Sequence, residues 1–441
     1  MEDIKDAILG ILSKKKLIGD VYIEENKKTE IMVEDGKIEN LISSDSFGAG
    51  IRIFKDKKMS FGFLTTKEKS EIEKLIDKLG NQALIEGYDS YMLTGYNRYN
   101  TVTLFDDTIM HIGQADKTAM LMEIEKNIKS YSDRIKFVRG TTYTDNNIKI
   151  SYVNTGGSSS SYEKTIFGIL TSALASDGTN EVMADKMEGA CFLRDINTQD
   201  MAKEVAQSAV GLLGAKSIKS GLYNIILPPY AAIQLLEAIA RMFYSNNVRK
   251  GKSLLYYSRE GDILASDKIT IADDSLMPNH AGSFPCDAEG AAGMDKTLVD
   301  TGVFKTLLYD RYNAQLMGKQ ASGNCIRDSF KSLPDVGVSN FYIKPGRAMK
   351  DLVMSKEKGI LVNSFMGLHT IDTVSGNFSV GIDGWLSSSG SAAVPVKDVL
   401  MTGNIKTMLT NVSEVCDDLK FYFNFGSPTI IIKDVQIAGR E

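Results

Sequence analysis

The segment Thr29-Glu30-Ile31-Met32-Val33-Glu34-Asp35-Gly36-Lys37-Ile38-Glu39-Asn40-Leu41-Ile42 decides the fold class of this chain. Two predicted strands, 29–34 and 37–42, flank the dipeptide Asp35-Gly36. Glycine tolerates the positive φ that a tight hairpin turn requires, so this pattern predicts an antiparallel β-hairpin. A second hairpin is predicted downstream, where 51–54 and 59–63 flank Asp56-Lys57-Lys58. The first segment is therefore predicted to be a β-meander between two helices.

The rest of the chain continues in the same antiparallel manner. The central segment is predicted to hold helices over 115–128 and 198–213 and strands over 136–143, 148–154, 163–175 and 179–191, with turns at 145–147 and 176–178. The third segment begins with a strand over 223–227, which Pro228-Pro229 ends, and a helix over 230–244 follows. Short strands dominate after this helix. No βαβ alternation is present, so we predict an α+β protein.

The chain length of 441 residues suggests two or three domains. We expect an N-terminal α/β subdomain over 1–110 and a central subdomain of helix, long strands and helix over 111–217. Together they form an N-terminal region of antiparallel sheet with helices. A C-terminal domain over 218–441 is expected to be a twisted, barrel-like antiparallel sheet with few helices.

Composition excludes several classes of protein. The net charge of −5 and the sequence pI near 5.5 argue against a surface dominated by nucleic-acid binding. We see no signal peptide and no apolar run of the roughly 18 residues that a membrane span needs. The four cysteines are far apart and form no CxxC motif, which is typical of free thiols in a reducing compartment. We therefore expect a cytoplasmic protein that binds neither nucleic acid nor membrane.

Local motifs give weak chemical signals. His280, Cys286, Asp287 and Glu289 include metal-ligand residue types close together, but the surrounding Pro and Gly mark a loop, and we favour no metal there. Ser161-x-x-Lys164 matches a hydrolase nucleophile pattern but begins a predicted strand, so we interpret it as chance.

Several short blocks are spread over nearly the whole chain. They are Val33–Glu39, Gly48–Arg52, Ala206–Gly214, Ser220-Gly221, Asp287–Gly290, Leu308–Asn313, Gly359–Val362, Thr402–Asn404, Gly426–Thr429 and Ile437–Gly439. In this order the blocks resemble the TldD/PmbA family, whose members are described as modulators of DNA gyrase and as U62-type peptidases; PmbA is also called TldE. Their collinearity is the specific signal.

One branch of that family resembles a zinc peptidase with His-Glu-x-x-x-His and a Cys near the C-terminus. In this chain the corresponding helix reads Leu236-Glu237-Ala238-Ile239-Ala240-Arg241, so only the Glu is kept. The Cys-bearing insertion before the last strand is also absent, and Cys416 lies upstream of its place. The resemblance therefore places the chain in the PmbA/TldE-like branch, which serves as the partner subunit of the zinc-bearing one. Leu236, Glu237 and Arg241 are then degenerate motif positions, and we expect no metal and no other cofactor.

The resemblance implies a non-catalytic subunit that pairs with a zinc-bearing TldD-like paralogue and helps to enclose a chamber for unfolded peptides, in a role such as peptide maturation. Two alternatives stay open: a standalone peptide-binding or scaffold homodimer, and an autonomous hydrolase with a relocated metal around Cys286 and Glu289. Within the Leu308–Asn313 block, Tyr309 and Arg311 are candidates for gripping an extended peptide. The alternative interpretation is a buried Tyr beside a surface pair of Asp310 and Arg311.

Overall fold

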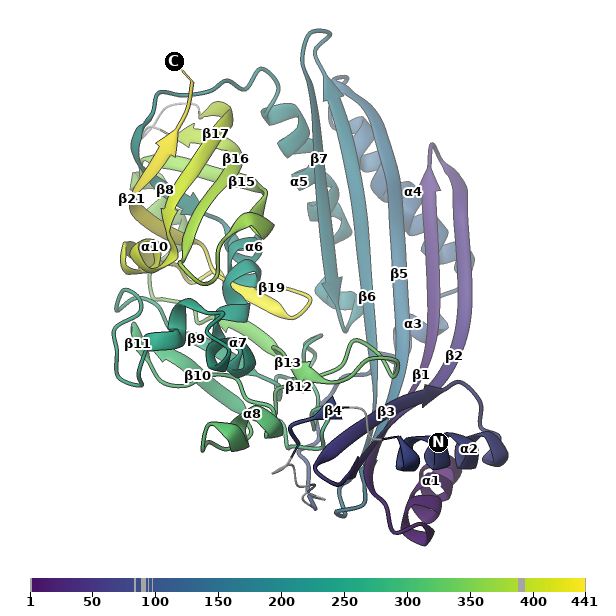
Figure 1. Cartoon of the computed structure of the whole chain (residues 1–441). Coiled ribbons are helices and arrows are strands. Elements are labelled where there is room, and N and C mark those ends of the chain that lie inside the picture. The colour runs from purple at the N-terminus through teal and green to yellow at the C-terminus, as the bar shows by residue number, and fades with distance from the viewer. Residues whose placement is uncertain are drawn as a thin grey trace.

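The computed structural model describes residues 2–82, 85–88, 93, 95–96, 98–387 and 393–440. A long, twisted sheet formed by the first half of the chain stands beside a C-terminal part built from shorter strands (Figure 1). This sheet is seven-stranded, in the order β4-β3-β2-β1-β5-β6-β7. Every neighbouring pair in it is antiparallel. The strands are β1 Ile18–Glu34, β2 Lys37–Lys55, β3 Lys58–Leu64, β4 Ile85–Glu86, β5 Ile135–Asn154, β6 Ser159–Ser176 and β7 Glu181–Ala190.

The predicted first hairpin is confirmed. Glu34 pairs with Lys37, and the turn residues Asp35 and Gly36 have φ of 50° and 69°. Positive φ at both central positions is the turn geometry whose twist matches that of the strands it joins. The second hairpin, β2 to β3, is confirmed as well.

The predicted turn at Asp145-Asn146-Asn147 is wrong, because β5 runs through it as one strand. Asn146 pairs with Lys28 of β1 on one side and with Ile166 of β6 on the other. Its side-chain Oδ1 also accepts a hydrogen bond from Asn26 Nδ2 at 3.1 Å. Polar residues end a strand only when their side chains compete with the ladder for backbone groups. Here they bond across the sheet, so the strand continues.

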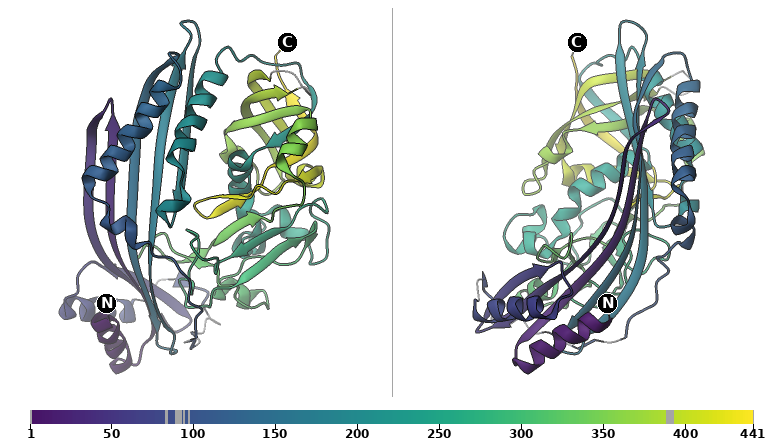
Figure 2. Two further views of the ribbon diagram at one scale, coloured as in Figure 1. Left: turned by 180° about the vertical axis from the view of Figure 1, so that it is seen from behind. Right: turned by 90° about the vertical axis from the view of Figure 1, so that its right-hand side faces the viewer.

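Helices cover one face of the long sheet. They are α1 Glu2–Lys14, α2 Lys69–Asn81, α3 Asp107–His111, α4 Gln114–Ser130 and α5 Thr198–Gly211. The longer α4 and α5 lie along the face turned away from the C-terminal part (Figure 2). Side chains alternate along β6: Phe167 and Ile169 are buried in the core beneath these helices, whereas Lys164 and Ile166 line a cavity against the C-terminal part. The sheet therefore presents one face to a core and the other to the rest of the molecule.

The C-terminal part contains the predicted barrel. Strands follow the order β17-β16-β15-β8-β21-β18, and an additional pairing of β17 with β21 closes the ring. These strands are β8 Gly221–Leu227, β15 Gly359–Met366, β16 Asn377–Ser387, β17 Val394–Asn404, β18 Val412–Val415 and β21 Ile430–Ala438. The barrel-like sheet expected from the sequence is thus confirmed, together with the α+β class.

A second six-stranded sheet lies next to the barrel, in the order β11-β10-β9-β14-β20-β19. Its strands are β9 Ile271–Asp274, β10 Asp295–Asp300, β11 Val303–Phe304, β14 Asn340–Ile343, β19 Lys420–Tyr422 and β20 Phe425–Ser427. A short pair, β12 Cys325–Ile326 and β13 Asp335–Val336, completes the strands of the described residues. The helices here are α6 Pro229–Ala240, α7 Ser245–Arg249, α8 Arg311–Leu316, α9 Lys350–Lys356 and α10 Ile405–Thr410. In the part of the chain that is described, no helix is long and apolar enough to cross a membrane.

Candidate functional site

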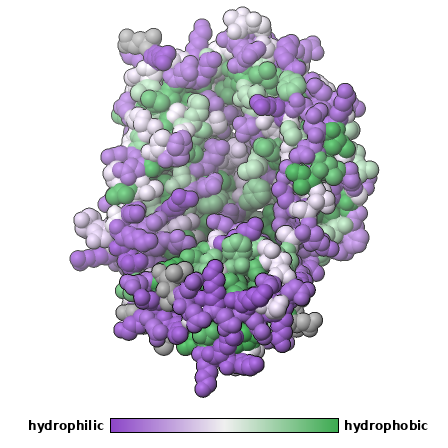
Figure 3. All heavy atoms as spheres, turned by 45° about the vertical axis from the view of Figure 1, so that its right-hand side comes forward, coloured by the Kyte–Doolittle hydropathy of each residue, from purple (hydrophilic) through white to green (hydrophobic). Residues whose placement is uncertain are grey.

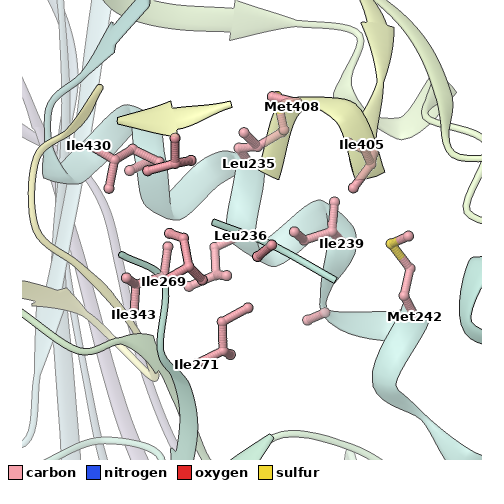
Figure 4. Close-up of a cluster of buried hydrophobic side chains, with 14 of the residues drawn as sticks. Leu235, Leu236, Ile239, Met242, Ile269, Ile271, Ile343, Ile405, Met408 and Ile430 are labelled. Atoms are coloured by element: carbon pink, nitrogen blue, oxygen red, sulfur yellow. The ribbon is translucent and has the colours of Figure 1, made fainter. Parts of the chain in front are cut away.

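Helix α6 carries the degenerate motif at the centre of the C-terminal part. Pro229 occupies its first turn, where a missing backbone N–H costs nothing. Leu236 is only 2% exposed. Its side chain lies among Ile269, Ile271 and Ile343, as Figure 4 shows. Burial of one Leu side chain stabilises the fold by roughly 2 kcal/mol, so position 236 acts as a core position.

Glu237 and Arg241 lie on the other side of this helix. Both are exposed, and the described residues provide neither with an ion pair. The α-helix ends at Ala240, and a tighter turn over Arg241–Phe243 follows, so the predicted helix to Tyr244 ends early. Residues 236 and 241 therefore do not converge: one side chain enters the core and the other faces solvent.

The side chains at these two positions do not fit a zinc ion. Zinc needs nitrogen, sulfur or oxygen donors, and a catalytic site uses three of them from the protein. Leu236 has no lone pair and sits in an apolar core, while the guanidinium of Arg241 is a permanent cation. Among the residues that the structure describes, no group of three or more His, Cys, Asp or Glu side chains is placed to hold a metal.

A cavity of about 520 Å³ opens where α6 faces the long sheet. Tyr230, at the start of α6, packs edge-on against Tyr422 of β19 with ring centroids 5.2 Å apart. Lys186 of β7 places its Nζ 5.8 Å and 5.6 Å from the centres of these two rings. A cation over aromatic faces is favourable, and more so when it is partly desolvated. The cavity thus combines a cationic side chain, an aromatic pair and the first turn of α6.

Lys186 is held by acids on both sides. Its Nζ lies 3.3 Å from Glu188 Oε1 and also contacts Glu204 of α5. Burial lowers the pKa of Lys186, and the nearby Glu188 opposes this effect. Sequence reasoning missed Lys186, Tyr230 and Tyr422, because only the folding of distant segments brings them together.

A neighbouring cavity of about 430 Å³ continues along the β19–β20 hairpin. The hairpin docks on the long sheet through Phe423, whose backbone N–H donates to Gly189 O at 3.0 Å. Gly189 is required there, since a Cβ at this position would lie 2.1 Å from the Phe423 ring. The two cavities share Glu204, Lys420 and Tyr422 in their walls, so they form one cleft between sheet and C-terminal part. Figure 3 shows hydrophobic residues along the middle of one face of the molecule, with hydrophilic ones around them.

The Leu308–Asn313 block lies inside the C-terminal part. Tyr309 is 4% exposed and belongs to the apolar core, which matches the alternative of a buried Tyr. Asp310 is not at the surface: its Oδ1 caps α8 by accepting from Asn313 N at 2.7 Å. The backbone N–H of Arg311 donates to Glu289 Oε2 at 3.0 Å. A role for Tyr309 and Arg311 in gripping peptide stays a prediction.

The residues considered for a relocated metal do not share one centre. Asp287 accepts from the backbone N–H groups of Glu289, Ala291 and Cys325. Burial, and then the charge of Glu289, raise the pKa of Asp287 to about 6. His280 packs its ring against Phe421, with centroids 4.6 Å apart. Asp287 therefore organises its own loop.

Glu289 instead joins the two halves of the molecule. Its Oε1 accepts from Arg52 Nη1 of β2 at 3.0 Å, and Arg52 also holds Asp20 of β1 through Nε at 2.9 Å and through Nη2. Tyr152 of β5 adds a hydrogen bond to Asp20 Oδ2 at 3.1 Å. Arg52, Asp20 and Glu289 are each at most 2% exposed. The sequence placed Arg52 and Glu289 in two separate family blocks but gave no sign that they meet.

Comparison with known proteins identifies this architecture. Three family models match this chain. The model of the PmbA/TldA metallopeptidase domain 1 matches residues 19–83, that of the central domain matches residues 110–213, and that of the C-terminal domain matches residues 220–439. The chain therefore belongs to the PmbA/TldD family. It is 26% identical to a protein named metalloprotease from Methanothermobacter thermautotrophicus, over 99% of both chains. It is 22% identical to a metalloprotease PmbA homolog from Buchnera aphidicola, over 95% of this chain and 93% of the relative.

Solved structures share the fold. TldE from Thermococcus kodakarensis superposes with a TM-score of 0.89 at 20% identity, covering 98% of this chain and 100% of that one. A Thermotoga maritima protein described as a proposed modulator of a DNA gyrase gives a TM-score of 0.90 at 22% identity, covering 99% and 100%. At this identity the likeness establishes the common architecture. The family resemblance inferred from the sequence is thereby confirmed, and the shared architecture agrees with the expected α+β fold.

Proposed function

We propose that this chain is the non-catalytic, PmbA/TldE-like subunit of a two-component metalloprotease that acts on unfolded peptides in the cytoplasm. The observation that carries the proposal is the placement of Leu236, 2% exposed within an apolar core on the helix where the zinc branch has a His. A catalytic zinc needs three protein ligands and a water, and neither Leu236 nor Arg241 offers a donor pair. Without a metal, the exposed Glu237 has no activated water to deprotonate.

The cleft supports a role in handling peptide. Its 520 Å³ and 430 Å³ cavities are joined and lie between sheet and barrel. A cleft of this kind has room for an extended chain, whereas a folded domain is too large to enter it. A cleft that selects its ligands by size does not need to recognise a particular amino-acid sequence in the peptide. We propose that the paralogue supplies the zinc chemistry while this chain contributes part of the enclosing wall.

The test is a peptide-cleavage assay with purified components. We expect this chain alone to be inactive, and its mixture with a zinc-bearing TldD-like paralogue to cleave an unstructured peptide. Chelation should abolish that activity. Glu237→Gln in this chain should leave the rate of the mixture unchanged, whereas Glu→Gln in the His-Glu-x-x-x-His motif of the paralogue should abolish it. Equal cleavage by this chain alone with and without chelator would refute the proposal.

Two further measurements address the alternatives. Stoichiometric metal in the purified chain, found by elemental analysis, would favour an autonomous hydrolase. A stable homodimer that binds peptide and does not combine with the paralogue would favour the scaffold.

A further inference from the structure

A third cavity, of about 250 Å³, lies deeper between the two halves of the molecule. It shares Ala281 and Phe423 with the 430 Å³ cavity, so it continues the same cleft. One wall consists of side chains from β1, β5 and β6. The other consists of the segments 281–288 and 325–327, the latter including β12, together with Val338, Phe423 and Asn424. Its volume is below the roughly 300 Å³ at which drug-sized pockets begin, so it suits one small group or residue.

Arg327 in this wall is a buried cation with unmet hydrogen-bond donors. Its side chain is 8% exposed, and its guanidinium is always charged. Nη1 donates to Ser332 O at 3.2 Å, but Nε and Nη2 are buried and find no acceptor among the described residues. Its guanidinium carbon lies 5.2 Å from the ring centre of Tyr22 and 5.8 Å from that of Phe61. These rings favour the charge but leave the N–H groups unsatisfied.

Asp20 and Asp287, two acids of this junction, are already engaged. Both oxygens of Asp20 accept from Arg52, and both oxygens of Asp287 accept backbone N–H groups. No ion pair joins an acid to Arg327 within the described ranges. Desolvation, and then the proximity of Arg52, lower the pKa of Arg327. Arg327 therefore lines the cavity without an ion pair of its own among the described residues.

A second cation lines the same cavity. Lys164 of β6 donates to Ala281 O at 2.9 Å, and burial lowers its pKa. Asp287 is the acid that the described wall contains, and three backbone N–H groups stabilise its charge. Two cations face one internally satisfied carboxylate, which leaves the cavity complementary to an anion.

We propose that this cavity binds a carboxylate of a peptide, with the side chains of Arg327 and Lys164 as its two positive charges. This rests on the proposed handling of peptides and adds to it a preference for an acidic group. The adjoining 430 Å³ cavity is lined by Glu188, Asp195, Asp200 and Glu204 and by the cation Lys420, so it disfavours a carboxylate. A peptide in the cleft would therefore place its negative group in the Arg327 cavity. The carboxylate comes from the peptide C-terminus or from an Asp or Glu side chain.

Isothermal titration calorimetry on the full chain tests this proposal. The probes are three acetylated peptides of one neutral sequence: one with a free C-terminus, one amidated, and one amidated with an internal Asp. Inorganic phosphate is the fourth probe. The variants are Arg327→Met and Lys164→Met, and Lys331→Met is the matched control that removes an exposed charge four residues from Arg327. A hydrogen bond to a charged group justifies an expected loss of affinity of about tenfold or more for Arg327→Met.

The expected result is that at least one carboxylate-bearing peptide binds more tightly than the neutral amide. That preference should disappear in Arg327→Met and weaken in Lys164→Met, and it should persist in Lys331→Met. The arm with the free C-terminus and the arm with the internal Asp identify the source of the carboxylate. If the charged and the neutral peptides bound with equal affinity, the inference would be overturned, but the proposed function would not be affected. The same holds if inorganic phosphate bound as tightly as the peptides. Binding of no probe would also overturn it, and the cleavage assay decides the proposed function separately.

Discussion

Replacement of Arg52 by methionine should be among the most destabilising single changes in this protein. Arg52 makes hydrogen bonds to Asp20 through Nε and Nη2 and to Glu289 through Nη1, and all three side chains are at most 2% exposed. The methionine side chain would fill much of the same space, so the change isolates the charge. Removal of one partner from a buried ion pair costs about 3–5 kcal/mol, because the remaining charge stays buried. Here two buried carboxylates lose their hydrogen bonds to the same cation, so we expect a loss in the upper half of that range.

Urea unfolding of the parent protein and of Arg52→Met, monitored by circular dichroism, measures this loss in the free energy of unfolding. Trp385, the single tryptophan, lies in β16 and donates to Gly211 O at 3.2 Å, so its fluorescence reports the barrel and its contact with α5. The control is Lys67→Met, which breaks a Lys67–Glu25 pair of 2.8 Å whose Lys is 56% exposed. Exposed pairs contribute under about 1 kcal/mol, so this variant should differ little from the parent.

If Arg52→Met lowered the free energy of unfolding by no more than Lys67→Met does, this explanation would be refuted. The triple variant Arg52→Met, Asp20→Asn and Glu289→Gln provides a second check. It removes the buried charges together and should recover much of the lost free energy of unfolding, because the penalty comes from the stranded carboxylates. Failure of this recovery would mean that packing, and not charge, sets the effect.

Three further results are expected. Burial raises the pKa of Asp287 from 3.8 to about 6 and also raises the pKa of Asp310, so the folded state binds these two protons more tightly than the unfolded state does. Their contribution to stability is therefore fully present below about pH 4 and decreases as the pH rises through 6. Urea midpoints at several pH values measure this dependence, and Asp310→Asn should make it less steep. Leu236→Ala should lower the free energy of unfolding by about 2–5 kcal/mol, whereas the exposed neighbour Glu237→Ala should change it by less than about 0.5 kcal/mol. Gly189→Ala should displace the β19–β20 hairpin, since its Cβ would lie 2.1 Å from a phenyl ring, and proteolysis within that hairpin should accelerate.

Much of the fold followed from the sequence because its signals are local. The Asp35-Gly36 turn needs positive φ, and that requirement, together with the strand-like segments on either side, predicted the first hairpin. The turn predicted at Asp145-Asn146-Asn147 was wrong for the opposite reason. The same polar residues are stable within a strand when their partners come from β1, more than a hundred residues earlier in the chain. A local pattern contains no information about such partners.

The candidate site was less predictable, because its residues come from separate segments. The degenerate helix was recognisable through its resemblance to a zinc motif, and the structure adds where its side chains point. Lys186, Tyr230 and Tyr422 meet only after the long sheet packs beside the barrel. Arg327 carries no motif at all. Its significance comes from burial combined with missing acceptors, and both are properties of the three-dimensional structure.

Two buried arginines at the same junction have different roles for this reason. Arg52 finds two carboxylates and becomes a clamp between the halves of the molecule, so its removal should weaken the fold. Arg327 forms no ion pair among the described residues, so its removal takes away a buried charge without such a partner and should leave the fold as stable or make it more stable without ligand. The same substitution to methionine should therefore destabilise the protein at position 52 and not at position 327. A cation that lowers the stability of the empty protein gains its counter-charge when a carboxylate enters, and this difference is the free energy available for binding.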